Sequence, residues 1–266
     1  TYPDGSYVTS GTATFTDPNG NDLSLQYAGN GIWTTDYHIE NNAPVGTWTI
    51  TVNANDGNDN TGTNSVDVEI SSDYTVNIIS QFLQEYNRGD TVTITASVVD
   101  ANNNQVSGAT VTANDPNGNL ITLTETATPG TYEIDYVIKD TDPTGTWTIT
   151  VTAEKNGNSG SDSASVTISN TYNVYIKTPA NGDVFSKGQI VRIRAHVEDV
   201  NSNNVNGATV TANDPNGNTI DLVDLGNGEY EVNYITRQTD PSGNWVITVN
   251  AEKDGNTGSD SITCLL

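Results

Sequence analysis

Short alternations of apolar and polar residues run through this chain of 266 residues. In one stretch the apolar members are Val92, Ile94, Ala96 and Val98, with threonine or serine between them. The same pattern recurs in residues 147–153 and 245–251. Because successive side chains of a strand point to opposite faces, a period of two predicts strands with one buried face. The sequence therefore predicts an all-β fold of antiparallel sheets.

Three motifs recur together at nearly constant spacing. The pentapeptide Asp-Pro-Asn-Gly-Asn begins at Asp17, Asp115 and Asp214, so its intervals are 98 and 99 residues. A Gly-x-aromatic-x-x-x-Tyr motif and then a Pro-x-Gly-x-Trp motif follow it each time, in the same order. This period is longer than that of solenoid units and fits whole domains.

Seven or so short strands per repeat, separated by turn-forming stretches, are typical of an immunoglobulin-like β-sandwich. We therefore predict a tandem array of three such domains, at residues 1–71, 72–169 and 170–266. The first is N-terminally incomplete and lacks its first two strands. Only nine residues precede Ser10, whereas repeat 2 has two predicted strands before the equivalent Ser107.

Two explanations of this gap remain open. Either the sequence begins inside a domain of a longer protein, or a strand from another subunit fills the gap. A sandwich without two strands exposes an unpaired edge and an apolar core face, which is unstable in water without repair. Strand complementation by an identical subunit or a neighbouring domain would make the chain a filament subunit.

Three stretches of repeat 2 carry a resemblance to known proteins. They are Ser-Gly-Ala-Thr-Val-Thr-Ala-Asn-Asp-Pro-Asn-Gly-Asn, Gly-Thr-Tyr-Glu-Ile-Asp-Tyr and Asp-Pro-Thr-Gly-Thr-Trp-Thr-Ile-Thr-Val. In this order they resemble tandem immunoglobulin-like repeats of bacterial and archaeal surface proteins, and also the macroglobulin-type domain of large secreted proteins. The resemblance covers the whole chain and implies an extracellular or cell-surface stalk, adhesin, filament or cell-envelope module. The thioester segment Cys-Gly-Glu-Gln of macroglobulins is missing, since Leu265 follows Cys264.

Charge narrows the classes of partner. The chain has 33 acidic and 9 basic residues and a formal net charge of −24. Nucleic acids and anionic membrane surfaces require clustered Lys and Arg, so neither is a predicted partner. No apolar run approaches the ~18 residues of a membrane span. An acidic surface favours cations as partners, or simply stays solvated.

Enzyme chemistry is not predicted. His38 and His196 lie in different repeats and have no partners in the repeated motifs, and no Gly-x-Ser-x-Gly or His-Glu-x-x-His motif occurs. His196 takes the strand position that Ser97 holds in repeat 2, so we expect it to face solvent or to pack at an edge. The single cysteine, Cys264, is expected to be a small buried strand residue, with an intermolecular disulfide or a reactive thiol as the alternatives.

Calcium is the one cofactor that the loops suggest, because it takes six to eight oxygens from carboxylates, amides and carbonyls. In an immunoglobulin-like array, two loops at the downstream end of repeat 2 would face a loop at the upstream end of repeat 3. The candidate ligands in these loops are Asp115, Asn117, Asn119, Asp140, Asp142, Asp199, Asn201 and Asn203. A cation there would offset like-charge repulsion and stiffen the array. The pentapeptide itself is predicted to form a turn.

Two functional hypotheses follow. The first is a non-enzymatic extracellular structural module, such as a stalk, a cell-envelope part or a filament subunit, stiffened by calcium at its junctions. The alternative is an adhesin or carbohydrate-binding module that recognises a glycan or another cell-surface ligand. The candidate for that role is repeat 1, with Trp33 and a divergent loop at Glu40, Asn41 and Asn42. The repeated aromatic residues lie in register with the apolar faces, so they are predicted to form cores.

Overall fold

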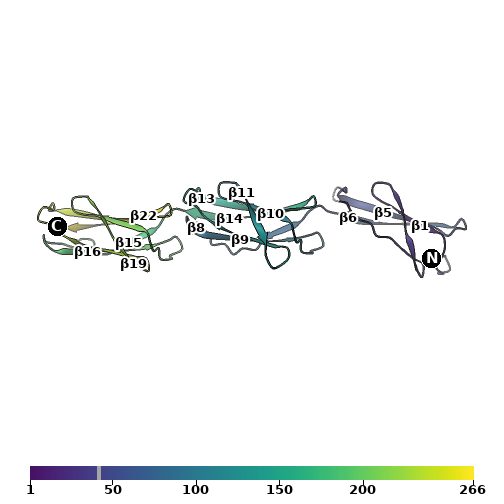
Figure 1. Ribbon diagram of the computed structural model, residues 1–266, viewed down its shortest axis with the longest axis horizontal. Helices are drawn as coiled ribbons and strands as arrows, with labels where there is room; N and C mark the ends of the chain where they lie inside the picture. Colours follow the sequence, from purple (N-terminus) through teal and green to yellow (C-terminus); the bar gives the residue numbers. More distant parts are fainter. Residues whose placement is uncertain (41–42) are drawn as a thin grey trace.

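A computed structural model describes residues 1–40 and 43–266. The regular structure of these residues is entirely β-strand, which confirms the predicted all-β fold. Three β-rich bodies follow one another along the long axis, and the two termini lie in the first and the last body (Figure 1). None of the described residues forms a helix long and apolar enough to cross a membrane.

Repeat 2, the central body, is a complete sandwich. Its strands are β7 (Thr75–Ile78), β8 (Glu85–Asn87), β9 (Thr91–Val99), β10 (Thr110–Asn114), β11 (Leu120–Glu125), β12 (Thr131–Val137), β13 (Gly145–Lys155) and β14 (Asn158–Ser169). They run in the order β7-β9-β12-β11-β10-β13-β14-β8, so β11 joins the two layers. Val92, Ile94, Ala96 and Val98 of β9 are fully buried between the layers, as their alternation predicts.

Repeat 3 repeats this architecture with two separate sheets, β15-β16-β20-β19 and β18-β17-β21-β22. Its strands are β15 (Asn173–Thr178), β16 (Ile190–Glu198), β17 (Thr209–Asn213), β18 (Thr219–Asp221), β19 (Val223–Gly226), β20 (Glu229–Ile235), β21 (Asn244–Lys253) and β22 (Asn256–Leu265). Cys264 is buried in β22, where it pairs with Trp245 of β21. It is therefore a structural strand residue, as expected.

The aromatic residues of the repeated motifs form cores in repeats 2 and 3. Trp147 and Trp245 are buried, and so are Tyr132 and Tyr230. The Tyr132 hydroxyl donates to the Val106 carbonyl (2.8 Å) and accepts the Ala109 N–H (2.9 Å). A buried hydroxyl needs such partners, because an unpaired polar group in a core is costly. The prediction of core packing is confirmed for these side chains.

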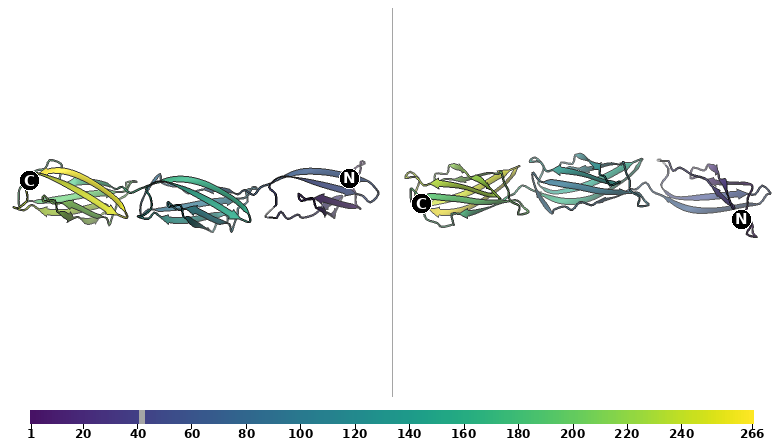
Figure 2. Two further views of the ribbon diagram at one scale, coloured as in Figure 1. Left: turned by 90° about the horizontal axis from the view of Figure 1, so that it is seen from above. Right: turned by 60° about the horizontal axis from the view of Figure 1, so that its bottom comes forward.

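Repeat 1 is an incomplete sandwich. Its strands are β1 (Thr12–Thr16), β2 (Asp22–Ser24), β3 (Gln26–Gly29), β4 (Ile32–Thr34), β5 (Gly46–Asn55) and β6 (Thr61–Ile70). One sheet runs β2-β1-β5-β6, and the other consists of β3 and β4 alone. Among the described residues, β4 pairs only with β3, whereas its counterpart β12 pairs with both β11 and β9. Counterparts of β7 and β9 are not found in the described part of repeat 1, and the body of repeat 1 is visibly thinner than the other two (Figure 2).

Candidate functional site at the domain junctions

The junction between repeats 2 and 3 is built around Asn87, the last residue of β8. Its side chain is only 2% exposed. Its Nδ2 donates to the carbonyl of Thr171 (3.0 Å) and to Oδ1 of Asn256 (3.2 Å). Its Oδ1 accepts the Val200 N–H at 3.0 Å. One side chain of repeat 2 therefore binds three separate segments of repeat 3.

Asn256 forms hydrogen bonds to repeat 2 from the repeat 3 side of the junction. It begins β22, directly after the β21–β22 turn, and it is 0% exposed. Its Nδ2 donates to the Arg88 carbonyl at 2.8 Å and to the Tyr172 hydroxyl at 3.1 Å. Its Oδ1 accepts the Arg88 N–H at 3.2 Å. The Asn256 side chain thus bonds to both the carbonyl and the N–H of Arg88, which fixes residues 87–88 against repeat 3.

The Arg88 guanidinium crosses the same junction. Its Nε and Nη2 donate to the Asp142 carbonyl at 3.1 and 2.6 Å, and its Nη1 donates to the Gly255 carbonyl at 3.3 Å. Gly255 has φ +72°, and a Cβ there would lie 3.2 Å from Cβ of Asp140 and 3.3 Å from Nη1 of Arg88. The close approach and the left-handed backbone together favour glycine.

Arg88 is a positive charge in acidic surroundings. A Cβ on Gly89 would lie 3.0 Å from a carboxylate oxygen of Asp254, so Asp254 approaches the turn closely. Burial, and then the negative charge of Asp199, raise the pKa of the Asp90 carboxyl. Because like charges repel most strongly where water is excluded, the guanidinium offsets part of the repulsion at this junction.

The predicted calcium ligands of the pentapeptide form a turn closed on itself. Oδ1 of Asp115 accepts the N–H groups of Asn117 (2.9 Å) and Asn119 (2.8 Å), and Oδ2 accepts from Nδ2 of Asn119 at 3.0 Å. Burial raises the pKa of Asp115, but the hydrogen bonds from Asn119 and Asn117 outweigh burial and lower it overall. The predicted turn is confirmed.

Asp142 is also held by its own repeat. Its Oδ1 accepts from Nδ2 of Asn117 at 2.7 Å, and its Oδ2 accepts from the Tyr136 hydroxyl (2.8 Å) and the Lys139 N–H (2.9 Å). The structure therefore joins Asp142 to the pentapeptide through Asn117. Asp140 lies apart from them, against Gly255 of repeat 3.

The third predicted loop lies on the other side of the junction. Oδ1 of Asp199 accepts the N–H groups of Asn201 and Asn203, both at 2.8 Å, and Oδ2 accepts from Nδ2 of Asn203 at 2.8 Å. Nδ2 of Asn201 donates across the junction to the Glu85 carbonyl at 3.0 Å. Throughout the part of the chain that the structure describes, no group of three or more His, Cys, Asp or Glu side chains is placed to hold a metal. Calcium binding by the predicted residues stays a prediction.

The junction between repeats 1 and 2 is different. No hydrogen bond links residues 1–70 to residues 74–266 among the residues that the structure describes. Asn158, the counterpart of Asn256, donates only to the Tyr74 hydroxyl, at 3.5 Å. The segment that carries Asn87 and Arg88 in repeat 2 has no counterpart in the described part of repeat 1. The hydrogen bonds that these two residues form to repeat 3 therefore have no equivalent at this junction.

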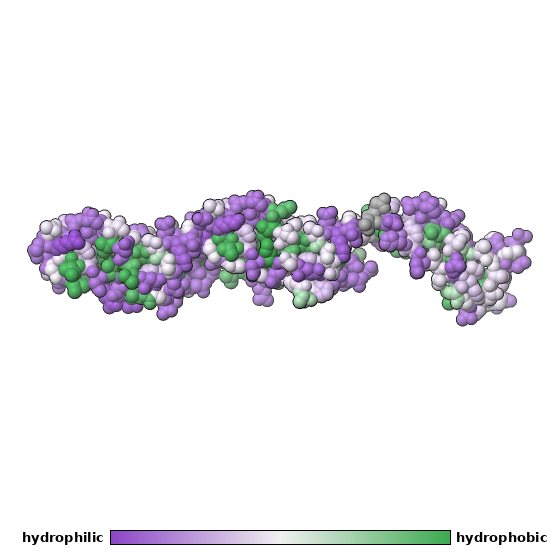
Figure 3. All heavy atoms as spheres, in the orientation of Figure 1, coloured by the Kyte–Doolittle hydropathy of each residue, from purple (hydrophilic) through white to green (hydrophobic). Residues whose placement is uncertain are grey.

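Repeat 1 contains an apolar trough of about 370 Å³ where a completed sandwich would have its core. The trough is lined by Phe15, Pro18, Leu25, Trp33, Thr34, Thr35, Tyr37, Trp48, Ile50 and Val52. The neighbouring Val68 is 38% exposed, whereas its counterparts Val166 and Cys264 are 2% and 1% exposed. On the face drawn in Figure 3, hydrophilic residues predominate and surround apolar patches on repeats 2 and 3. We name this hollow the repeat 1 trough.

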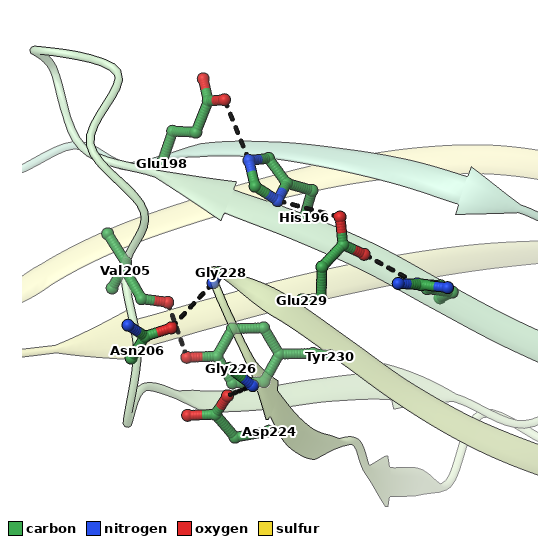
Figure 4. A network of polar contacts seen from close by, with 10 residues as sticks. His196, Glu198, Val205, Asn206, Asp224, Gly226, Gly228, Glu229 and Tyr230 are labelled. Atoms are coloured by element: carbon green, nitrogen blue, oxygen red, sulfur yellow. Dashed lines mark hydrogen bonds and ion pairs between the residues drawn. The ribbon is translucent and has the colours of Figure 1, made fainter.

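Repeat 3 has a polar network on β16 that sequence reasoning missed (Figure 4). Nε2 of His196 lies 2.9 Å from Glu198, its Nδ1 lies 3.1 Å from Glu229 without hydrogen-bond geometry, and Nε of Arg194 lies 2.8 Å from Glu229. The His196 side chain is only partly exposed. At the position of Arg194, repeat 2 has Thr95, which donates to Glu133 at 2.8 Å. The contacts of Arg194 and His196 with Glu229 join β16 to β20, whereas Glu198 lies on β16 beside His196.

Comparisons with known proteins give structural likeness only. No family model and no curated protein sequence matches the chain. Among solved structures, the tetra-tandem repeat in the extending region of a large adhesion protein is 21% identical with a TM-score of 0.35. The match covers 96% of this chain and 66% of that one, so the chain spans just under two thirds of that structure.

Two further structures are tandem repeats as well. The titin domains I67–I69 are 10% identical over 95% of this chain and 86% of that one, with a TM-score of 0.40. The fibronectin(III)-like modules of Clostridium thermocellum CbhA are 20% identical over 72% and 94%, with a TM-score of 0.30. Similarity this low carries no functional argument. The strand topology of the chain itself defines the class: a protein of tandem immunoglobulin-like repeats.

Proposed function

We propose that the chain is a non-enzymatic structural module, an extended spacer in an extracellular surface or filament protein. The observation that carries the proposal is the hydrogen-bonded junction of repeats 2 and 3. There the side chains of Asn87 and Asn256 are almost fully buried and bond to each other and to main chain of the opposite repeat. Domains that share only a linker move freely, so a junction of buried hydrogen bonds serves to hold two domains in line. Fixed junctions give a tandem array reach and stiffness, which a spacer needs.

The extracellular assignment rests on the sequence. The repeated motifs resemble those of bacterial and archaeal surface proteins, and a net charge of −24 keeps a long particle solvated. Calcium at the junction is the further element of the proposal, since the Asp142 and Asp199 loops both lie at the boundary that Arg88 crosses. A cation would add to the positive charge that Arg88 supplies.

Distance measurements between spin labels test the spacer proposal. Asn53, Thr152 and Asn250 are equivalent exposed positions on β5, β13 and β21. We expect a narrow distance distribution between labels at Thr152→Cys and Asn250→Cys. A broad distribution there would show that the junction does not hold the two repeats in line, and the proposal would fail.

A second function is favoured by a separate observation, the repeat 1 trough with its unpaired strand β4. We propose that repeat 1 accepts β-strands from a partner, which would complete its sandwich. Main-chain hydrogen bonds along β4 would supply affinity, and apolar side chains in the trough would supply specificity. Hydrogen exchange of the β4 amides with and without a synthetic peptide of residues 73–99, which contains β7 and β9, tests this function.

Carbohydrate binding by repeat 1 has weaker support. Tyr27 and Trp33 lie 5.2 Å apart but are tilted by 59°, so they do not form one flat platform for a sugar ring. Trp33 also lines the trough. Asn41 and Asn42, which the sequence singles out for this role, lie outside the described residues. A glycan array with the intact chain tests this alternative.

A further inference from the structure

The three pentapeptide turns have the same backbone. In each turn the glycine N–H donates to the carbonyl of the first aspartate at 2.9 Å, from Gly20 to Asp17, from Gly118 to Asp115 and from Gly217 to Asp214. The φ angles of the three glycines are +84°, +84° and +83°. The central asparagine of each turn is exposed. A difference in reactivity among the three asparagines must therefore come from their surroundings.

An asparagine followed by glycine can lose its side-chain amide by reaction with its own main chain. The glycine nitrogen bonds to Cγ of the asparagine, and the amide nitrogen leaves as ammonia with the proton that the glycine nitrogen gives up. Water then opens the cyclic imide at one of its two carbonyls. Asparagine and water thus give ammonia and either aspartate or isoaspartate. Glycine permits this attack best because it has no side chain to obstruct it.

The attack requires an amide that is free to turn toward the glycine nitrogen. In repeat 2, Nδ2 of Asn117 donates to Oδ1 of Asp142 at 2.7 Å. In repeat 3, Nδ2 of Asn216 donates to Oδ1 of Asp240 at 2.9 Å. Hydrogen bonds to carboxylates are stronger than those between neutral groups. This bond must break before the amide can turn and its nitrogen can leave, so the carboxylate slows the reaction.

The two carboxylates are themselves held in place. Asp142 is 0% exposed and Asp240 is 2% exposed. Oδ2 of Asp240 accepts from the Tyr234 hydroxyl at 2.9 Å and from the Arg237 N–H at 2.7 Å, which matches the bonds of Asp142 in repeat 2. Conversion of the neighbouring asparagine to aspartate would also place two carboxylates in contact, where like charges repel. Both the reaction and its product are therefore disfavoured in these repeats.

Repeat 1 has the same turn without the carboxylate. Ala43 stands directly before Pro44, in the position that Asp142 holds in repeat 2. The Ala43 N–H donates to the Glu40 carbonyl at 2.9 Å, just as the Asp142 N–H donates to the carbonyl three residues before it at 3.1 Å. The main chain is thus in place for a carboxylate, and only the side chain is missing.

The missing carboxylate changes the contacts of two side chains. The hydroxyl of Tyr37, the counterpart of Tyr136, donates instead to Oδ2 of Asp17 at 3.3 Å. Within residues 1–40 and 43–266, the Asn19 side chain has no hydrogen-bond partner, and only its main-chain N–H is bound, to Oδ1 of Asp17. The Asn19 amide therefore lacks the restraint that holds its two counterparts.

We propose that Asn19 is a site of spontaneous deamidation, and that Asp142 and Asp240 protect the equivalent Asn117 and Asn216 from it. The modification adds a negative charge to repeat 1, and isoaspartate adds an atom to the main chain of the turn between β1 and β2. Pro18 of this turn lines the repeat 1 trough, so the modification changes the rim of the trough. The inference goes beyond the spacer function and does not depend on it.

The test is incubation of the full chain at mildly alkaline pH, with mass spectrometry of its proteolytic peptides over time. We expect Asn19 to react at least about tenfold faster than Asn117 and Asn216, since a hydrogen bond to a carboxylate accounts for such a factor in rate. Ala43→Asp supplies the carboxylate to repeat 1 and should slow Asn19 by a similar factor without changing Asn117. Equal rates for the three asparagines in the parent chain would overturn the proposal.

Asp142→Ala is the reverse variant. It should speed the reaction of Asn117 about tenfold and leave that of Asn216 unchanged. Asn156, in the β13–β14 turn at the other end of repeat 2, is the control for a loosened fold. An unchanged rate at Asn117 in this variant would overturn the protection by Asp142. If Asn117 and Asn156 both react faster, repeat 2 has loosened and the Ala43→Asp chain decides: an unchanged rate at Asn19 there overturns the proposal.

Discussion

Asn87 and Asn256 lie 169 residues apart in sequence and form a buried hydrogen bond of 3.2 Å between Nδ2 and Oδ1 across the junction of repeats 2 and 3. Each amide also binds main chain of the opposite repeat. A buried amide without a hydrogen-bond partner bears an uncompensated desolvation cost. Both amides therefore form all their hydrogen bonds only when the two repeats hold this relative orientation. The junction is therefore part of the fold of both repeats.

Asn256→Ala should loosen this junction. The substitution removes one hydrogen bond each from the Arg88 carbonyl, the Arg88 N–H and Nδ2 of Asn87 in a buried site, which costs about 1–3 kcal/mol. We expect an earlier urea transition for repeat 3 and a broader label distance between Thr152 and Asn250. Asn158→Ala is the matched control, since Asn158 has only the Tyr74 hydroxyl as partner. Equal effects of the two substitutions would contradict the role assigned to the junction.

Arg88→Ala should make the chain more dependent on cations. The variant leaves Asp90, Asp199 and Asp254 around the junction without the guanidinium. Their repulsion is then offset only by dissolved ions, so millimolar calcium should raise the melting temperature of the variant more than that of the parent chain. Melts in EDTA and in magnesium are the controls. If calcium raises neither melting temperature, calcium has no role at this junction.

The Tyr234–Asp240 pair predicts loss of stability in alkali. Burial, and then the hydrogen bond of 2.9 Å to Asp240, raise the pKa of Tyr234 from 10.0 to about 12. The folded state therefore keeps a proton that the unfolded state has lost. The stability from this pair is complete below pH 10 and falls as the pH rises from 10 to 12. Tyr136 has the same partner geometry with Asp142, and its pKa is also raised.

Tyr234→Phe isolates this effect. The variant has no ionisable hydroxyl at the site, so its repeat 3 should lose less stability between pH 10 and pH 12 than the parent chain does. Urea unfolding at a series of pH values measures the difference, and absorbance at alkaline pH follows tyrosine ionisation directly. Parallel pH curves for parent and variant would show that the pair does not set the alkaline limit.

How much the sequence predicts depends on where the signal lies. Strands such as β9 were predicted because burial on one face leaves a period of two in the local sequence. β8 was missed, because the three residues Glu85 to Asn87 are too few to show a period of two and Asn87 is buried by residues far along the chain. A comparison of the hairpin turns would have given a hint, since Lys-x-Gly-Asn-x-Gly occurs at residues 155–160 and 253–258.

The sequence predicts which loops adjoin the junction, but not the hydrogen bonds that their side chains form. Strand topology put the Asp115 and Asp199 loops at the two ends that adjoin the junction. The sequence does not show what the carboxylate oxygens of these loops bind. An Asp-x-Asn-x-Asn stretch is compatible with cation binding and also with a turn in which the Asp carboxylate accepts N–H groups of its own loop. In the structure both carboxylates accept N–H groups of their own loops. Arg88, which spans the junction, lies outside the three motifs that carried the prediction of repeats.

Matched substitutions at equivalent strand positions test whether repeat 1 is incomplete in solution. Val166 is 2% exposed and Val68 is 38% exposed, although both pair with the tryptophan of their repeat. Val166→Thr places a hydroxyl in a closed core and should cost about 1–3 kcal/mol. Val68→Thr places it where water already reaches, so the change should stay within about 0.5 kcal/mol. Urea unfolding of both variants measures these costs. Equal costs would mean that repeat 1 is closed in solution.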